Sequence, residues 1–228
     1  MSNPAARGVR DVELFLDVSC PWCHGALTTV RRLLDEVAAD PDLPAVRVRH
    51  RFIRLHDMKP PEGIAADRLY ASFGMTPDQI AAADADLKGF LDSVGVRVDR
   101  TRQTFYYNPL QAHRLLAMVR DDPGTDAPDI WSLARAVWNA NFVLGTAIDD
   151  VPALRAAVIE AGLTVPQRIW DRMADPQDHL EVTLADRARA LEVSLDGVPR
   201  FYIGTTIVPA WKPIDEVRTN LRAALSAA

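Results

Sequence analysis

The sequence contains very little cysteine: of its 228 residues, only Cys20 and Cys23 carry a thiol. So few cysteines exclude a disulfide framework of the kind that holds small secreted domains together. Long hydrophobic runs are also missing, and none approaches the ~20 residues that a helix needs to cross a bilayer. Residues 1–10 lack the apolar stretch of a signal peptide. We therefore expect a cytoplasmic protein that does not enter a membrane.

An excess of positive charge is absent too. The chain has 26 basic and 31 acidic residues, a net charge of -5, and no cluster of lysine and arginine beside aromatic residues. Nucleic acid is therefore not an expected partner. The apolar content of 48% in a chain of this length supports one large domain, or a domain that carries an insertion.

Both cysteines lie within residues 16–24, where a strand pattern gives way to an amphipathic helix pattern. A thiol in the first turn of a helix faces unpaired backbone N–H groups and the positive end of the helix dipole, which favour its thiolate. Cys20 is therefore the predicted nucleophile. Cys23 lies one turn further along, so it can attack a mixed disulfide on Cys20 and release the partner. The pair predicts a thiol-disulfide oxidoreductase.

Three other interpretations of the two cysteines stay open at this point. The string from Cys20 to His24 is also the attachment signature of c-type haem, a cofactor whose attachment requires export. A zinc site would need four ligands, and only the two cysteines and His24 are clustered. A structural disulfide across two intervening residues would close too small a loop to stabilise much. Redox chemistry is favoured, and no metal site is predicted.

The N-terminal part of the chain has the pattern of a βαβ unit. Residues 9–18 alternate as a strand does, with Leu14 and Leu16 on one face and Glu13 and Asp17 on the other. Apolar residues then recur at helical spacing as far as residues 40–41. Residues 45–53 alternate again. Two strands joined by a helix within about 50 residues predict a parallel βαβ unit.

Between residues 60 and 193 the pattern is helical, and no strand is predicted. Residues 76–79 and 108–111 each combine a cap, a proline and a glutamine in the order of a helix start. Further helices are predicted at residues 129–144, 151–161 and 177–191. The large aromatic residues of this region are predicted to pack between helices, the alternative being a groove beside Trp22 for an apolar partner. These aromatic residues are Trp131, Trp138, Phe142 and Trp170.

Strand patterns return at residues 200–203 and 206–209, separated by two residues as in a short hairpin. A final helix is predicted to begin near Pro213. The order βαβ, helices, ββα predicts an α/β fold with a large all-helical insertion. We expect one discontinuous domain of residues 1–60 and 194–228, and an insertion domain of residues 61–193.

This order, with Cys20-Pro21-Trp22-Cys23 near the start and residues 197–199 before the late hairpin, resembles the thioredoxin fold. More closely, it resembles the DsbA-like group of FrnE-type dithiol oxidoreductases. The quoted similarity covers residues 15–24, 50–56, 108–116 and 195–203. The resemblance implies a thioredoxin-like fold and a cis peptide bond before Pro199, opposite the cysteines. Because proline has no N–H, Val198 would then be free to pair through its main chain with an extended partner segment.

The resemblance extends to kappa-class glutathione transferases and hydroxychromene-carboxylate isomerases, which carry a serine in place of Cys20 and activate bound glutathione. The cysteine at this position favours thiol-disulfide exchange. The alternative is a reductase, transferase or isomerase that uses a low-molecular-weight thiol on small aromatic compounds. The expected partner is a disulfide-containing protein or a small thiol. No cofactor is expected beyond the Cys20–Cys23 disulfide and such a thiol as cosubstrate, and the expected state is a monomer or a homodimer.

Several residues near the cysteines are candidates for supporting roles. Pro21 and Trp22 carry no charge, so the thiolate of Cys20 should depend mainly on the helix terminus. His24 shares a helical face with Cys20, and it is either a protonated imidazole that favours the thiolate or a solvent-facing polar residue. Asp17 is either a buried proton relay for Cys23 or a partly exposed strand carboxylate.

The other histidines lie far from one another in the sequence. We expect His50, His56 and His113 to be structural or exposed rather than catalytic. By position alone, His56 and Asn108 are candidate residues of the substrate rim.

Overall fold

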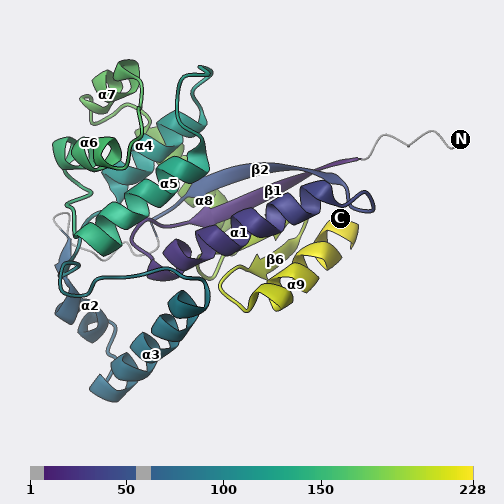
Figure 1. The fold of residues 1–228 in the computed structure, drawn as a ribbon, viewed down its shortest axis with the longest axis horizontal. Coiled ribbons are helices and arrows are strands. Elements are labelled where there is room, and N and C mark those ends of the chain that lie inside the picture. Colours follow the sequence, from purple (N-terminus) through teal and green to yellow (C-terminus); the bar gives the residue numbers. More distant parts are fainter. Residues whose placement is uncertain (1–7, 55–62, 228) are drawn as a thin grey trace, which may run out of the picture.

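A computed structural model describes residues 8–54 and 63–227 of the chain (Figure 1). Its centre is a four-stranded sheet in the order β2-β1-β5-β6. β1 pairs in parallel with β2 and antiparallel with β5, and β5 pairs antiparallel with β6. The strands are β1 (Val9–Leu16), β2 (Ala45–Phe52), β5 (Arg200–Ile203) and β6 (Thr206–Pro209). The predicted βαβ unit and the predicted late hairpin are both confirmed.

Two long helices cover one face of the sheet. Figure 1 shows α1 (Pro21–Ala39) and α9 (Ile214–Ala227) side by side in front of the strands. α1 buries the apolar stripe that its sequence period predicts, while its charged residues face outward. The buried apolar residues of this stripe include Ala26, Leu27, Val30, Leu33, Leu34 and Val37.

The opposite face is covered by helices that lie between β2 and β5 in the sequence. α4 (Leu110–Arg120) and α8 (Leu180–Glu192) contact β2 and each other. Around them lie α5 (Ile130–Asn139), the π-helical turn η1 (Ala140–Leu144), α6 (Val151–Glu160) and α7 (Gln167–Met173). The helices predicted at residues 129–144, 151–161 and 177–191 are therefore present, and the division into two domains stays a prediction.

A further pair of helices, α2 (Ala66–Ser72) and α3 (Pro77–Ser93), extends away from the sheet in Figure 1. The predicted cap at the start of α3 is confirmed, because Thr76 and Gln79 form a reciprocal capping box. α3 lies very close to α1 at Gly25, where an added Cβ would stand 2.5 Å from a ring carbon of Phe90. Only a glycine lets the two helices approach in this way.

Three details differ from the sequence prediction. β3 (Ile64–Ala65) and β4 (Phe105–Tyr106) form a small antiparallel sheet, so the prediction of no strand between residues 60 and 193 is wrong. Strands of two residues are too short to show an alternating pattern. The sequence predicts a cap at Asn108 and Pro109 as the first helical residue, whereas Pro109 is the N-cap residue and α4 begins at Leu110. The Asn108 side chain accepts a hydrogen bond from the Leu110 N–H at 3.1 Å. α2 and α7, of seven residues each, were not predicted individually.

The aromatic residues of the helical region pack as predicted. Trp138 and Phe142 are completely buried, Trp170 is almost so, and all three belong to the hydrophobic core. Trp131 is half-buried against this core, with the guanidinium of Arg31 5.7 Å above its ring. Among the helices of the described residues, none is long and apolar enough to cross a membrane.

Candidate active site

The two cysteines meet at the N-terminus of α1. Cys20 is the N-cap residue and has an extended backbone, as expected of a residue that precedes a proline, and Pro21 opens the helix. Cys23 lies in the first turn. The two cysteines are 3.6 Å apart and both are free thiols. This separation lets one sulfur attack a disulfide formed on the other.

Burial differs between the two thiols. Cys20 retains 6% of its surface, whereas Cys23 retains none. The Cys23 sulfur accepts a hydrogen bond from the Asp17 N–H at 3.5 Å. The pKa of Cys23 is held well above its ordinary value, mainly by burial. The neighbouring Cys20 and the negative charge of Asp17 raise it further. Cys23 is therefore a neutral thiol at neutral pH.

The late segment of the chain lies directly against Cys20. The Val198–Pro199 peptide bond is cis, as the resemblance implied. The Cys20 thiol lies 3.9 Å from the carbonyl oxygen of Val198 and donates to it. Both Val198 and Pro199 are buried. The N-terminal end of α1, with Cys20, and the turn before β5 therefore form one candidate site, although they are far apart in the sequence.

Three side chains from the helical region hold the backbone of residues 18–20. The Trp138 indole N–H donates to the carbonyl oxygen of Cys20 at 3.2 Å, and the Asn141 amide donates to that of Val18 at 3.0 Å. His113 Nε2 accepts the N–H of Val18 at 3.1 Å. None of these residues was assigned to the site from sequence. The spacing of Trp138 and Asn141, three residues apart on one predicted helix, was the signal available.

His24 is neither exposed nor charged. It is 4% exposed, its Nε2 lies 3.0 Å from Asn139 Oδ1, and its ring stacks on Phe142. Burial lowers the pKa of His24 to about 4, so the imidazole is neutral at pH 7. Both sequence interpretations of this residue, a protonated partner of Cys20 and a solvent-facing side chain, are therefore wrong. The contact with Asn139 also engages the ring nitrogen that the haem interpretation would require.

Asp17 is completely buried, which excludes the alternative of a partly exposed carboxylate. Its Oδ1 accepts the N–H of Ser19 at 2.8 Å and lies 3.3 Å from His113 Nε2. His113 is itself 1% exposed. The carboxylate and the imidazole thus form a buried pair, and the backbone N–H of the same Asp17 contacts the Cys23 sulfur.

The other predicted site residues have different surroundings. Trp22 is half-buried and stacks on Phe90 of α3, with ring centroids 5.2 Å apart. The Asn108 side chain accepts the Leu110 N–H just before α4, and its place on a substrate rim stays a prediction. His56 lies outside the described residues. Within residues 8–54 and 63–227, no three His, Cys, Asp or Glu side chains form a group that could hold a metal ion.

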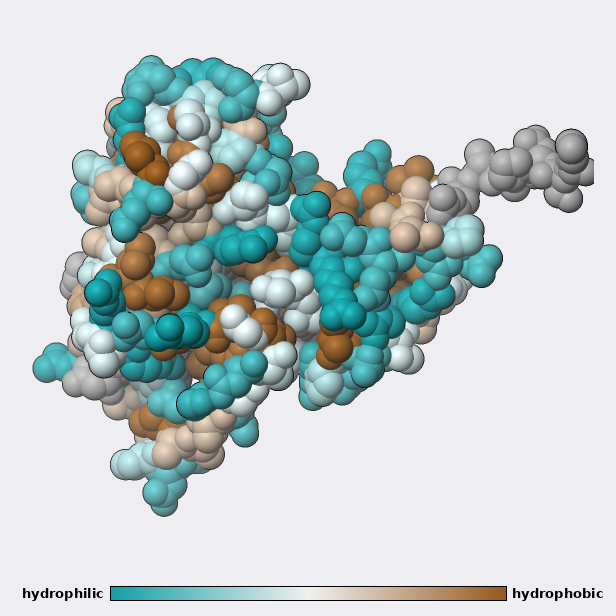
Figure 2. Space-filling view, viewed as in Figure 1, coloured by the Kyte–Doolittle hydropathy of each residue, from teal (hydrophilic) through white to brown (hydrophobic). Residues whose placement is uncertain are grey.

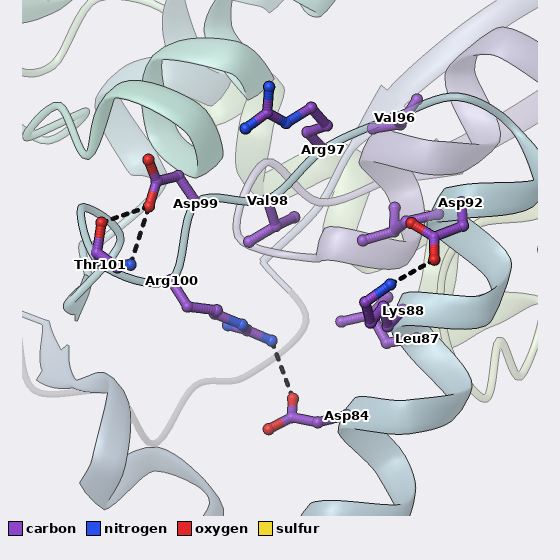
Figure 3. A pocket seen from close by; sticks show the side chains of 11 residues that line it. Asp84, Leu87, Lys88, Asp92, Val96, Arg97, Val98, Asp99, Arg100 and Thr101 are labelled. Carbon is purple, nitrogen blue, oxygen red and sulfur yellow. Dashed lines mark hydrogen bonds and ion pairs between the residues drawn. The ribbon is translucent and has the colours of Figure 1, made fainter.

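The surface beside the site is partly apolar. Figure 2 shows hydrophobic surface gathered between α5 and α3, on the side where α1 begins. A cavity of about 650 Å³ lies nearby between α3 and residues 96–101 (Figure 3). Its charged side chains include two ion pairs, Asp84–Arg100 and Lys88–Asp92. Neither cysteine lines this cavity.

A βαβ unit, a late ββα unit, a Cys-x-x-Cys pair at a helix N-terminus and an opposing cis-proline together define a thioredoxin-fold protein with a dithiol site. The DSBA-like thioredoxin domain matches residues 11–222, and the chain belongs to this family. Among curated proteins, none matches the sequence.

Solved structures share the fold at low sequence identity. A Streptomyces coelicolor protein described as a DsbA oxidoreductase is 22% identical, with a TM-score of 0.79 over 96% of this chain and 91% of that one. A 2-hydroxychromene-2-carboxylate isomerase is 15% identical, with a TM-score of 0.62 over 95% of each chain. The cytosolic disulfide reductase DsbM of Pseudomonas aeruginosa, solved with GSH, is 16% identical, with a TM-score of 0.56 over 95% of this chain and 99% of that one.

Proposed function

We propose that this protein is a thiol-disulfide oxidoreductase in which Cys20 is the nucleophile and Cys23 the resolving thiol. The observation that carries the proposal is the pair of free cysteines, 3.6 Å apart at the start of α1 and opposite the cis Val198–Pro199 bond. Membership of the DSBA-like family supports the same class of reaction.

In the first step, the Cys20 thiolate attacks a substrate disulfide. A bond forms between Cys20 and one substrate sulfur, the substrate S–S bond breaks, and the other sulfur leaves as a thiolate that takes a proton from water. The free N–H groups at the start of α1 stabilise the negative charge on Cys20. An extended substrate segment pairs with the main chain of Val198, whose carbonyl oxygen already faces Cys20.

In the second step, Cys23 resolves the mixed disulfide. Its sulfur attacks Cys20, the Cys20–Cys23 bond forms, and the second substrate sulfur leaves with the electron pair. The substrate disulfide has then been reduced to two thiols, and the protein dithiol has been oxidised to a disulfide. Asp17 receives the proton that Cys23 loses. A low-molecular-weight thiol reduces the protein disulfide and resets the cycle.

A second candidate is an enzyme that uses a small thiol to reduce, transfer to or isomerise an aromatic compound. Its support is the similarity in fold to an isomerase of this kind and to a reductase solved with GSH. The cysteine at position 20 favours exchange, because a thiolate attacks disulfides directly. We place the protein in the cytoplasm, where a Cys-x-x-Cys pair is more often catalytic than structural.

The two candidates are separated by a turnover assay with purified protein. Reduction of a disulfide-containing protein such as insulin is measured with dithiothreitol and, separately, with glutathione as the reductant. We expect turnover with both, loss of turnover in Cys20→Ser, and a trapped mixed disulfide in Cys23→Ser. Activity on aromatic compounds that requires glutathione and persists without reduction of protein disulfides would favour the second candidate instead.

A further inference from the structure

Resolution of the mixed disulfide requires the removal of a proton from a group that water does not reach. Cys23 has no exposed surface, and burial together with Cys20 and the charge of Asp17 raises the pKa of its thiol well above the ordinary value. A neutral thiol is a poor nucleophile, so its attack on Cys20 depends on a nearby proton acceptor.

Asp17, whose backbone N–H contacts the Cys23 sulfur, has its carboxylate close to a second buried side chain, His113. Asp17 Oδ1 and His113 Nε2 are 3.3 Å apart, and the two side chains are 0% and 2% exposed. The Asp17 N–H also contacts the Cys23 sulfur at 3.5 Å. A carboxylate oxygen and an unprotonated imidazole nitrogen at this distance repel each other, whereas a proton between them is bonded to both. The geometry therefore suits a pair that takes up one proton.

His113 Nε2 has a partner whether or not this proton is present. Without the proton, Nε2 accepts the Val18 N–H at 3.1 Å, which places the ring hydrogen on Nδ1. With the proton, Nε2 and Asp17 Oδ1 share it across their 3.3 Å separation. Taking up the proton therefore exchanges the bond from the Val18 N–H for a bond to Asp17 Oδ1, and it leaves the buried Val18 N–H without this acceptor, so the pair holds the proton only transiently.

His113 also lines a small cavity of about 60 Å³ on its other side. A cavity of this size has room for water, which needs roughly 10–15 Å³ of probe-occupied volume. The cavity is bordered by Thr183, Arg54 and Arg187, and by Leu184, which is 54% exposed at the surface. Arg54 and Arg187 are the charged residues that border this cavity with His113, and the Arg187 guanidinium donates to the Arg54 carbonyl oxygen at 2.7 Å. While Nε2 carries the proton, the buried Val18 N–H lacks this acceptor, which favours release of the proton to water in the cavity.

We propose that Asp17 and His113 together accept the proton of Cys23, and that His113 passes it to water in the cavity. This inference rests on the proposed thiol-disulfide exchange and adds His113 to it. When the Cys23 sulfur attacks Cys20, its proton moves to the Asp17–His113 pair. The bond between Cys20 and the substrate sulfur breaks, and this sulfur leaves as a thiolate that takes a proton from solvent.

The two chemical steps are separated by the aromatic disulfide dithiobis(nitrobenzoate) in a stopped-flow instrument. Attack by Cys20 releases one coloured thionitrobenzoate, and resolution by Cys23 releases the second. The variant is His113→Gln, whose side-chain oxygen can still accept the Val18 N–H but cannot take a proton. The matched control is His50→Gln, because His50 is also a buried histidine, 4% exposed, and lies on Trp131 rather than on Asp17.

We expect His113→Gln to release the first thionitrobenzoate at the wild-type rate and the second about 100-fold more slowly at neutral pH. The difference between wild type and variant should shrink as the pH rises, because a Cys23 thiol that loses its proton to hydroxide no longer needs the pair. Asp17→Asn should slow the second release to the same extent, and the double variant should be no slower, since the two residues act as one unit. His50→Gln should behave as wild type.

A second release in His113→Gln with the wild-type rate and pH profile would overturn the proposal. So would equal slowing in His50→Gln, which would indicate a general effect of losing a buried histidine. If His113→Gln fails to fold, Asp17→Asn carries the same test, because its amide oxygen can still accept the Ser19 N–H. Wild-type protein that releases only one thionitrobenzoate would contradict the exchange mechanism itself and not only the role of His113.

Discussion

Two carboxylates of residues 8–54 and 63–227 are completely buried, and their partners differ. Asp186 on α8 is bonded by two arginines and by a backbone N–H, whereas the carboxylate of Asp17 lies against a histidine. Arginine keeps its proton at any pH that a protein tolerates, while histidine exchanges its proton near neutrality. In the mechanism that we propose, the partner, and not burial alone, decides whether a buried carboxylate takes part in proton transfer.

Asp186 joins three elements of the fold. Its oxygens accept from Arg51 Nη1 at 2.9 Å, from Arg120 Nη1 at 2.7 Å and from the Phe52 N–H at 3.2 Å. α8 is thereby fixed to α4 and to the end of β2. This end of β2 runs parallel to Leu16, directly before the turn that carries Asp17. Asp186 therefore helps to hold the turn that carries Asp17.

The largest effect that we predict is on stability and comes from Asp186→Ala. Removing this side chain takes one of two carboxylate partners from each of Arg51 and Arg120, and breaking such a buried ion pair costs about 3–5 kcal/mol of unfolding free energy. Urea denaturation measures the loss. In the fraction that remains folded, the two releases of thionitrobenzoate should keep their wild-type rates. A stability within 1 kcal/mol of wild type, about the scale of an exposed pair, would contradict a structural role for Asp186.

The next effect is on rate and comes from Asp17→Asn. The amide keeps the shape of the side chain but cannot accept a proton, so the second release should slow by about 100-fold, equivalent to ~2.7 kcal/mol in the barrier. Stopped-flow absorbance gives the rate of the second release, and urea denaturation of the same sample gives the stability. A variant that loses stability as Asp186→Ala does, but resolves at the wild-type rate, would show that the two carboxylates have the same structural role.

Acid should lower the free energy of unfolding through two other buried histidines, His24 and His50. Burial lowers the pKa of His24 and of His50 to about 4. Because the unfolded chain takes up these protons near pH 6.5 and the folded chain does not, stability is complete above that pH and falls as the pH decreases toward 4. Each histidine should remove about 2 kcal/mol between pH 7 and pH 5.

His50→Phe tests this effect, because the ring lies between Phe52 and Trp131 and a phenyl group keeps both contacts. The variant should lose less stability than wild type between the two pH values, by about 2 kcal/mol in urea denaturation. An unchanged difference would mean that His50 titrates alike in the folded and the unfolded chain.

The smallest predicted effect comes from Trp138→Phe. The substitution removes the indole N–H that donates to the Cys20 carbonyl oxygen at 3.2 Å and keeps a six-membered aromatic ring. Loss of one such hydrogen bond costs about 1 kcal/mol. Thermal unfolding followed by circular dichroism measures it. A loss as large as that of Asp186→Ala would place Trp138 among the main supports of the fold.

Much of the fold can be predicted from local patterns. The alternation of β1 and β2, the apolar stripe of α1 and the capping box of α3 depend on residues close in the sequence, and all three are confirmed. β3 and β4 could not be predicted, because a strand of two residues is too short to show alternation of apolar and polar residues. The cis bond before Pro199 followed from the family resemblance rather than from local sequence.

The cysteines of the candidate site were equally evident, but the residues around them were not. His113, Trp138 and Asn141 reach the turn at residues 18–20 from 95, 118 and 123 positions away, so only the packing of α4, α5 and η1 brings them there. His24 shares a helical face with Cys20, which suggested a protonated imidazole beside the thiolate, the alternative being a solvent-facing side chain. The helical region covers that face, and the ring is buried against Asn139 and Phe142.

The most direct test of the account is the number of thionitrobenzoate ions that each reduced protein releases from dithiobis(nitrobenzoate). We predict two for wild type, one for Cys23→Ser and none for Cys20→Ser, because only Cys20 is placed to attack and only Cys23 to resolve. Intact mass should show an internal disulfide in wild type and one bound thionitrobenzoate in Cys23→Ser. Release by Cys20→Ser at the wild-type rate would contradict the assignment of Cys20 as the nucleophile.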